Sequence, residues 1–415
     1  MKRTFLLLTA AVLASAAVVV AAGAAPSAAP GVTAKSILLE GTFPLSGPAS
    51  GYAPIPAAMQ AYFQYANAQK GGVNGRKIIF KYQDDGYNPA NTVQLTHQFV
   101  EQDHAFALVG GLGTEPQLPV RQYLNDNKVP QLFVSTGATT FDRDWSQYPW
   151  TIGWQPDYEA EGAIYGKYIV KNFPTAKLGV LYQNDDYGND YLRGLNAGLT
   201  AQHQNQIVAT APYDLSSSPP AAQVAKLKAS GADTFIIFAT PTPTIQSYVI
   251  ATKLGWKPAH IITNSVSATD AFLTIATKSG SDLTNGTLTV NYLLDPSNPI
   301  YNKQPGMKLY RKIMARYDPK GNANDGLNLY GVAKAWNIVQ LLKQLGKNPT
   351  RAGLMKAARN MNFTAKAKNA NPFALPGVDI VTKGSDQFPI SQVTLVQYTN
   401  NVFKPLGKLI NGRGA

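Results

Sequence analysis

Residues 106–114 read FALVGGLGT, and residues 132–139 read LFVSTGAT. In each stretch a short apolar run, typical of a buried strand, gives way to glycines and hydroxyl-bearing residues where the strand would end. In an open α/β sheet, small molecules bind beyond the carboxyl ends of the strands, because helix N-termini and free backbone N–H groups converge there. The sequence therefore predicts that Gly110–Thr114 and Ser135–Thr139 form one side of a small-molecule site.

The segments on either side of these stretches alternate between apolar runs and longer amphipathic segments. A first series runs from Ser36 to Val134, and a second begins after Pro156 and ends at Thr263. This alternation predicts βαβ units with a parallel sheet and right-handed crossovers. We therefore expect an α/β fold made of two doubly wound, Rossmann-like units in tandem.

The last third of the chain departs from this alternation, and we expect it to pack back on both units. The expected elements are a strand over 286–293, helices over 307–317, 326–345 and 350–360, and a hairpin of 390–398 with 402–406.

The N-terminus has the pattern of a secretory leader. Lys2 and Arg3 form a basic start, Phe5 to Val20 is apolar, and small residues up to Ala29 offer cleavage sites. We therefore expect residues 1–29 to be a signal peptide. The chain has no cysteine, which excludes disulfides and the lipid-bearing cysteine that follows some leaders. A freely diffusing periplasmic protein is the expected mature form.

The charge balance does not indicate a nucleic-acid partner. The 415-residue chain carries 37 basic and 24 acidic residues, for a formal net charge of +13, which is enough to attract polyanions. The Lys and Arg residues are nevertheless scattered, with no run longer than pairs such as Arg311-Lys312. We interpret them as a solvated surface.

The sequence offers little for catalysis. His97 and His104 do not form a zinc-binding H-E-x-x-H pattern. Asp84-Asp85 and Asp185-Asp186 fall in polar turns, whereas acid–base catalysis needs a carboxyl with a raised pKa. No G-x-S-x-G elbow and no complete dinucleotide fingerprint occur. We expect no enzymatic activity, no cofactor and no bound metal.

Hydroxyl-bearing and aromatic residues favour binding without chemistry. Thr114, Ser135 and Thr139 place hydroxyls beside backbone amides, which suits a carboxylate or another polar head group. Tyr52 and Tyr187 lie in turns where a ring can pack against a solute. Ordinary loop composition and helix capping would explain the same residues, and the sequence leaves both explanations open.

A weak internal repeat supports two similar units. YQDDGY at 82–87 recurs as YQNDDYG at 182–188, each time at an expected strand end before a helix. Similar units would each present a solute-facing edge, whereas two turn-forming sequences can also agree by chance. The sequence supports both interpretations about equally.

Taken together, several short motifs resemble the branched-chain amino acid type of periplasmic solute-binding protein. They are Leu45-Ser46-Gly47-Pro48, Asn67-Ala68 with GGVNGR at 71–76, Asp84-Asp85, Gly113-Thr114, VPQLF at 129–133, Ser135–Ala138 and Asp185-Asp186-Tyr187-Gly188. The resemblance runs from about Ser36 into the last hundred residues. It implies a two-lobed type I periplasmic binding protein, with three crossover hinge segments, that closes on a small solute and delivers it to the membrane permease subunits of an ABC importer.

The resemblance also implies lobe boundaries and a monomer. The N-terminal lobe would comprise 34–154 and about 296–380, and the C-terminal lobe 155–295 and about 381–415. The first hinge would lie at 153–157, with return crossings near Asp295 and Ile380. Together with the residues noted above, the expected ligand-binding set is Tyr52, Leu112, Gly113, Thr114, Ser135, Gly137, Ala138, Thr139, Tyr187, Ala239, Thr240, Asn264, Ser265 and Val266.

One position departs from the family pattern. Amino-acid binders of this family carry an acidic residue after the strand at 261–262 to pair with the ligand ammonium, whereas this chain has NSVS at 264–267. An ammonium buried without a counter-charge is strongly unfavourable. Unless Glu115, Asp186 or Asp270 takes that role, the ligand lacks a free α-amino group. Aromatic or aliphatic carboxylates and neutral amides are then as well supported as leucine.

Two other classes of protein remain as alternatives. A ligand-sensing or regulatory protein of the same fold would have the same sequence features, although the leader argues against a cytoplasmic regulator. A periplasmic enzyme would need a reactive group that the sequence does not provide.

Overall fold

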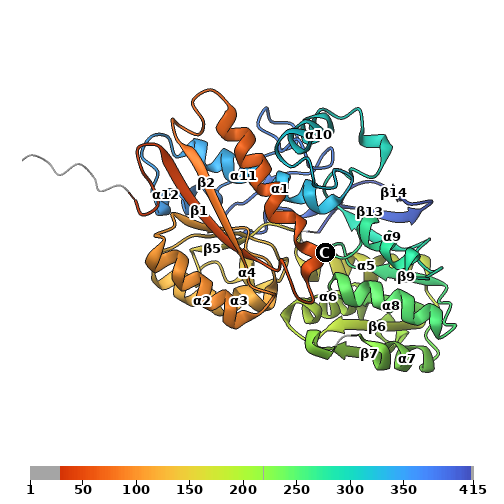
Figure 1. Ribbon diagram of the computed structural model, residues 1–415. Coiled ribbons are helices and arrows are strands. Elements are labelled where there is room, and N and C mark those ends of the chain that lie inside the picture. Colours follow the sequence, from red (N-terminus) through yellow and green to blue (C-terminus); the bar gives the residue numbers. More distant parts are fainter. Residues whose placement is uncertain (1–28, 218, 413–415) are drawn as a thin grey trace, which may run out of the picture.

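The computed structural model describes residues 29–217 and 219–412, and the expected signal peptide lies outside them except for Ala29. These residues form two α/β lobes side by side, each built around its own sheet (Figure 1). The α/β class and the two-lobed arrangement predicted from the sequence are confirmed. Within the described residues, no helix has both the length and the apolar character needed to span a membrane.

The first lobe contains a five-stranded parallel sheet in the order β2-β1-β3-β4-β5. Its strands are β1 (Ser36–Phe43), β2 (Lys77–Asp84), β3 (Ala107–Val109), β4 (Gln131–Val134) and β5 (Thr151–Gly153). Strands β3 and β4 are neighbours, with Leu108 opposite Gln131, and Leu112 and Ser135 pair just beyond their ends. The two glycine- and hydroxyl-rich stretches therefore lie side by side at the carboxyl edge of the sheet.

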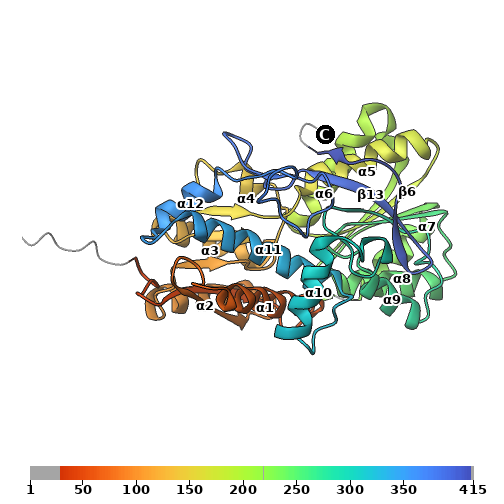
Figure 2. The same ribbon diagram turned by 90° about the horizontal axis from the view of Figure 1, so that it is seen from above.

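Helices from both ends of the chain cover this sheet. They are α1 (Pro54–Ala68), α2 (Pro89–His97), α3 (Thr114–Asp126), α4 (Thr140–Arg143), α10 (Pro305–Tyr317), α11 (Gly326–Gln344) and α12 (Arg351–Ala358). Helix α11 is buried along most of its length and lies between α1 and α12 (Figure 2). A Cβ on its Gly331 would come within 2.4 Å of the Ile55 carbonyl oxygen, so α1 and α11 approach closely at this point.

The second lobe contains an eight-stranded sheet whose main path is β14-β13-β10-β9-β8-β6-β7, with β15 paired to β13. Strands β6 to β10 are parallel, whereas β13 joins β10 antiparallel. The strands are β6 (Leu178–Gln183), β7 (Ile207–Tyr213), β8 (Thr234–Phe238), β9 (His260–Thr263), β10 (Leu288–Asn291), β13 (Gln392–Thr399), β14 (Val402–Pro405) and β15 (Ile410–Asn411). The helices are α5 (Tyr158–Asn172), α6 (Asp186–His203), α7 (Ala221–Ala229), α8 (Pro241–Lys253) and α9 (Asp270–Lys278).

The chain passes between the two sheets at three places. The connecting segments are residues 154–157 between β5 and α5, residues 292–304 between β10 and α10, and residues 382–391 between β12 (Ile380–Val381) and β13. Strand β12 pairs with β11 (Asn362–Phe363), which follows the first-lobe helix α12. On this basis we propose the lobe boundaries given above, with these three segments as hinges.

Some elements differ from the sequence prediction. One amphipathic segment of the first series, 89–102, is α-helical only to His97 and continues as a π-helical turn over Gln98–Gln102. The second series does not end at Thr263, because Thr269 caps a further helix, α9, by accepting a hydrogen bond from the Phe272 amide at 3.3 Å. Strand β5 was not expected, since three residues carry too little pattern to identify a strand.

Helices α5 and α6 pack at very short range over glycines. A Cβ on Gly194 would lie 2.0 Å from the Glu159 carbonyl oxygen, and one on Gly198 would lie 2.2 Å from the Ala163 carbonyl oxygen. Larger residues at these positions would force the two backbones apart. The glycines therefore fix the spacing of the helices that carry Tyr158 and Tyr187.

We expect Gly194→Ala to lower the free energy of unfolding by about 2 kcal/mol, as overpacking typically does. In an ordinary helix the same change stabilises by up to about 1 kcal/mol, so the sign of the effect is diagnostic. Urea denaturation measures it. Gly407→Ala is the control, because no atom lies within 4 Å of its added Cβ. A stabilised Gly194→Ala variant would contradict the observed helix spacing.

Candidate functional site

A cavity lies between the two lobes and is lined by residues from both of them and from the connecting segments. Six tyrosines contribute to its wall, together with backbone and side-chain polar groups. The lining residues are Tyr52, Ile55, Tyr87, Leu112, Gly113, Thr114, Ser135, Gln155, Tyr158, Tyr187, Thr240, Ser265, Val266, Ala268, Thr269, Asp270, Val290, Asn291, Tyr292, Leu293, Leu294, Asp295, Gly326, Leu327, Tyr330 and Phe403. Nine of the predicted site residues are among them, and their contact with a solute stays a prediction.

The first-lobe wall is formed where β3 and β4 end. Gly113 has a φ of +104°, and a Cβ there would lie 2.5 Å from the Tyr87 ring. Only glycine fits both this backbone conformation and the space. Thr114 begins α3, so backbone N–H groups at the N-terminus of the helix lie beside the cavity. Its hydroxyl is hydrogen-bonded to that of Thr136 at 2.6 Å. This wall suits an anionic or polar head group.

Aromatic rings from both lobes form the apolar part of the wall. The Tyr158 and Tyr187 rings meet edge to face at 5.1 Å, and Tyr158 stacks on Tyr191 at 4.6 Å. From the first lobe, the Tyr52 ring contacts Phe272 of α9 at 6.5 Å. Burial raises the pKa of the Tyr52 and Tyr187 hydroxyls, so both remain neutral. The two lobes are therefore in direct aromatic contact around the cavity.

Tyr87 lines the cavity although the sequence analysis did not select it. It is buried and has a φ of +59°, a conformation that non-glycine residues seldom adopt. Asp85 stabilises this turn by accepting hydrogen bonds from the Tyr87 amide at 2.9 Å and the Thr92 hydroxyl at 3.0 Å. The signal was present in the internal repeat, in which Tyr87 and Tyr187 both follow an aspartate-rich turn.

A buried carboxyl supports the second-lobe loop at Ser265. Glu161 of α5 accepts hydrogen bonds from the Ser265 amide at 2.8 Å and from its hydroxyl at 2.7 Å. Burial raises the pKa of Glu161, and the Ser265 bonds act in the opposite direction. The Tyr165 hydroxyl donates a third hydrogen bond at 2.7 Å. Ser265 and Val266 are therefore held in place at the cavity wall.

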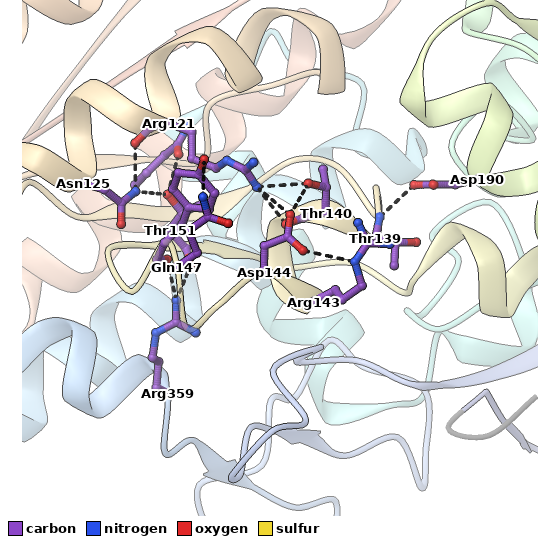
Figure 3. Close-up of polar contacts among 12 residues, drawn as sticks. Arg121, Asn125, Thr139, Thr140, Arg143, Asp144, Gln147, Thr151, Asp190 and Arg359 are labelled. Carbon is purple, nitrogen blue, oxygen red and sulfur yellow. Dashed lines mark hydrogen bonds and ion pairs between the residues drawn. The ribbon is translucent and has the colours of Figure 1, made fainter.

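Three predicted residues of the first lobe do not line the cavity. A Cβ on Gly137 would lie 2.0 Å from the Pro156 carbonyl oxygen, so Gly137 packs against the first connecting segment. The Ala138 side chain is fully buried. The Thr139 amide donates to Asp190 of α6 at 2.8 Å, which Figure 3 shows, and its hydroxyl donates to Asp157 at 3.3 Å. Thr139 therefore contributes to the contact between the lobes.

Two predicted residues of the second lobe are also outside the cavity lining. The Ala239 carbonyl oxygen accepts hydrogen bonds from the Thr244 hydroxyl at 3.0 Å and the Ser267 hydroxyl at 2.5 Å. Asn264 is fully buried, and its amide group is hydrogen-bonded to the Tyr187 hydroxyl. Asn264 therefore positions Tyr187 from behind the cavity wall.

Acidic side chains do reach the cavity, at another part of its wall. Asp270 and Asp295 are lining residues, whereas Glu115 and Asp186 are not. The Tyr398 hydroxyl donates to Asp270 at 2.7 Å, and Asp295 Oδ1 accepts from the Ser297 hydroxyl at 2.7 Å. Among the described residues, no group of three or more His, Cys, Asp or Glu side chains could hold a metal ion. Of the three acids considered above, Asp270 is the one that lines the cavity.

A buried carboxyl anchors the last residue of β5, next to the first connecting segment. Asp142 Oδ1 accepts from the Gly153 amide at 2.9 Å, while Oδ2 has no hydrogen-bond partner. Nearby, Arg359 donates to the carbonyl oxygen of Pro149 at 3.0 Å. It also donates to the carbonyl oxygen of Thr151 at 2.6 Å, and Figure 3 labels both of these residues. Burial raises the pKa of Asp142 to about 7, although the Arg359 charge opposes this shift.

This raised pKa predicts a pH dependence of stability. Between an unfolded-state pKa near 3.8 and a folded-state pKa of about 7, the folded protein binds the proton more tightly, so this group lowers stability as pH rises. Asp142→Asn keeps the acceptor for Gly153 and removes the titration. We expect the free energy of unfolding of the variant, relative to the unmodified protein, to rise by about 2 kcal/mol between pH 5 and pH 8. Denaturation at the two pH values measures this difference, and a pH-independent difference would contradict it.

The chain matches known proteins over most of its length. Residues 42–402 match the family model described as periplasmic binding protein. A Leu/Ile/Val-binding protein homologue of Brucella melitensis is 27% identical over 197 residues, which are 46% of this chain and 50% of that protein. An amino acid binding protein of Pseudomonas aeruginosa is 28% identical over 167 residues, 39% of this chain and 43% of that protein. The chain thus aligns with about half the length of these relatives.

Solved structures with the same fold extend this comparison. A branched-chain amino acid ABC transporter protein from Thermus thermophilus with bound valine has a TM-score of 0.78 at 18% identity, covering 92% of this chain and 97% of that one. A fatty acid ABC transporter substrate-binding protein from Thermomonospora curvata has a TM-score of 0.76 at 20% identity, covering 94% and 96%. The family match and the shared fold lead to one conclusion: the chain belongs to the periplasmic binding protein family, of the leucine-binding-protein-like type I class.

Proposed function

We propose that this protein is the solute-binding subunit of an ABC importer and binds a small carboxylate between its two lobes. The observation that supports this most strongly is the cavity itself, whose wall combines the α3 N-terminus, hydroxyl groups and six tyrosines from both lobes. Helix N-termini and hydroxyls stabilise an anionic head group, and aromatic rings bury an apolar body. The arrangement supports binding, and we propose no catalytic step.

The proposed solute class follows from the polar groups of the wall. Thr114 and Ser135 lie at the first-lobe edge, while the second-lobe loop presents Ser265 and Val266 without an acidic residue. Valine and fatty acids, for which two structurally similar proteins are named, both carry a carboxylate. A solute that also carries an ammonium would need Asp270 or Asp295 as its counter-charge. Comparing the affinity of L-leucine with that of 4-methylpentanoate, its analogue without the amino group, shows whether the site accepts an ammonium.

Binding across both lobes provides the mechanism for transport. The lobes already contact each other through Thr139 and Asp190, and through Tyr52 and Phe272. A solute touching both walls stabilises this closed arrangement only by its greater affinity for it than for an open one. The closed form would then present its surface to permease subunits in the membrane. We propose that the protein works as a periplasmic monomer, exported through the leader at residues 1–29.

Small-angle X-ray scattering with and without solute tests this proposal. A thermal-shift screen of small carboxylates and their amides, with L-leucine included, first identifies solutes that bind. We expect a bound solute to reduce the radius of gyration, because the lobes close. Saturating binding with an unchanged radius of gyration, or no binding by any solute of the screen, would contradict the proposed function.

A further inference from the structure

A lysine is fully buried directly behind the first-lobe wall of the cavity. Lys334 lies in α11, between Ala333 and Ala335, and its side chain has no exposed surface. Its Nζ atom donates a hydrogen bond to the Ser135 hydroxyl and lies 3.4 Å from the Gly110 carbonyl oxygen. Nζ also lies 4.6 Å from the centre of the Tyr330 ring. A basic side chain is seldom fully buried.

Lys334 has no acidic partner. Within residues 29–217 and 219–412 it forms no ion pair, and its polar contacts are one hydroxyl and one carbonyl oxygen. Burial lowers the pKa of its ammonium well below the ordinary value. An unpaired buried charge is strongly unfavourable, so a lysine at this position destabilises the protein unless an anion compensates it.

Two of the residues that Lys334 contacts are themselves part of the cavity wall. Ser135 and Tyr330 both line the cavity, so the Lys334 side chain packs directly against two residues of the cavity wall. The Ser135 hydroxyl donates to the Gly110 carbonyl oxygen at 2.7 Å. Since Lys334 is also within reach of that carbonyl oxygen, the serine proton can turn toward a solute while Gly110 keeps a donor.

The position of Lys334 also agrees with the polarity of the wall. The N-terminus of α3 at Thr114 contributes a partial positive charge at the same edge of the sheet. The acidic lining residues, Asp270 and Asp295, come from α9 and the second connecting segment and do not contact Lys334. An anion at the Ser135 edge can therefore stabilise the ammonium form of Lys334.

We propose that Lys334 makes the cavity selective for solutes with an anionic head group. Lys334 is a positioning residue, because its hydrogen bond orients the Ser135 hydroxyl. Its ammonium also attracts the anion electrostatically through the cavity wall. This inference rests on the proposed function and specifies its solute class. The solute carries a carboxylate whose oxygens face Thr114 and Ser135. An amide of the same shape binds weakly, since it carries no charge that could stabilise the ammonium form of Lys334.

Paired solutes and one isosteric substitution test this proposal. The probes are 4-methylpentanoate, phenylacetate, hexanoate and L-leucine, each compared with its primary amide by calorimetry. We expect the unmodified protein to bind the acid of a pair at least about 100-fold more tightly than the amide. In Lys334→Met we expect this ratio to fall to about tenfold or less, because only the α3 N-terminus and the hydroxyls remain. We also expect the ligand-free variant to unfold at a higher temperature.

The controls separate selectivity from packing. Lys343→Met changes an exposed lysine of the same helix and should leave the ratio unchanged. If Lys334→Met does not fold, Lys334→Gln and the ratio measured on the unmodified protein take its place. Two results would overturn the role of Lys334 while leaving the proposed function intact. One is equal affinity of the unmodified protein for acids and amides. The other is a loss of affinity in Lys334→Met that is equal for acids and amides. Binding of neither class would overturn the proposed function itself.

Discussion

Replacing Gly113 with alanine should weaken solute binding by more than 100-fold, which corresponds to about 3 kcal/mol. The added Cβ would lie 2.5 Å from the Tyr87 ring and 2.9 Å from Pro116 Cδ. Both neighbours are held in place, Tyr87 by its buried turn and Pro116 by the first turn of α3. Relief of the clash must therefore displace either Tyr87 or the helix N-terminus, and both line the cavity.

The matched control for this variant is Gly280→Ala. Gly280 has a φ of +103°, nearly the same as that of Gly113, but no atom lies within 4 Å of its added Cβ. Both variants therefore place a Cβ on a residue with positive φ, and only Gly113→Ala also carries the clash. Calorimetric titration with the tightest-binding carboxylate compares them. Equal affinities for the two variants would show that the Gly113 turn does not shape the site.

The second large effect is expected for Tyr187→Ala. Tyr187 is buried, packs against Tyr158 and Tyr191, and lines the cavity from the second lobe. Removing its ring takes away the apolar surface that faces the first-lobe wall, and we expect affinity to fall by about 100-fold. The cavity left behind should also lower the free energy of unfolding by about 3 kcal/mol.

Two further variants show which part of Tyr187 matters. Tyr187→Phe keeps the ring and loses only the hydrogen bond to Asn264, so its affinity should fall by less than about tenfold. Tyr168→Ala removes a half-buried ring of the same lobe that packs on Phe173 outside the cavity. It should leave affinity unchanged. If Tyr168→Ala weakened binding as much as Tyr187→Ala, the effect would reflect lobe stability rather than contact.

The sheets could be predicted because their signals are local. The apolar runs before Gly110 and Ser135 each give way to glycines and hydroxyl-bearing residues, and β3 and β4 end there. Parallel order then places the two ends at one edge, where Thr114 and Ser135 line the cavity. Helix α9 was missed because the residues before its cap at Thr269 resemble an ordinary loop.

The remaining parts of the site depend on contacts that no local pattern records. Gly137 and Thr139 belong to the same stretch as Ser135, yet the chain turns after β4 and directs them toward Pro156 and Asp190. Asp295 reaches the cavity from a segment that connects the lobes. Lys334 resembles an ordinary helix lysine in the sequence, and only the packing of α11 behind β3 and β4 reveals its burial.

An X-ray structure with the tightest-binding carboxylate tests the central claim most directly. The account predicts one solute between the lobes, with its carboxylate oxygens within hydrogen-bond distance of Thr114 and Ser135 and its apolar body against Tyr87, Tyr158 and Tyr187. A solute bound outside this cavity, or one whose carboxylate faces Asp270 and Asp295 instead, would contradict it.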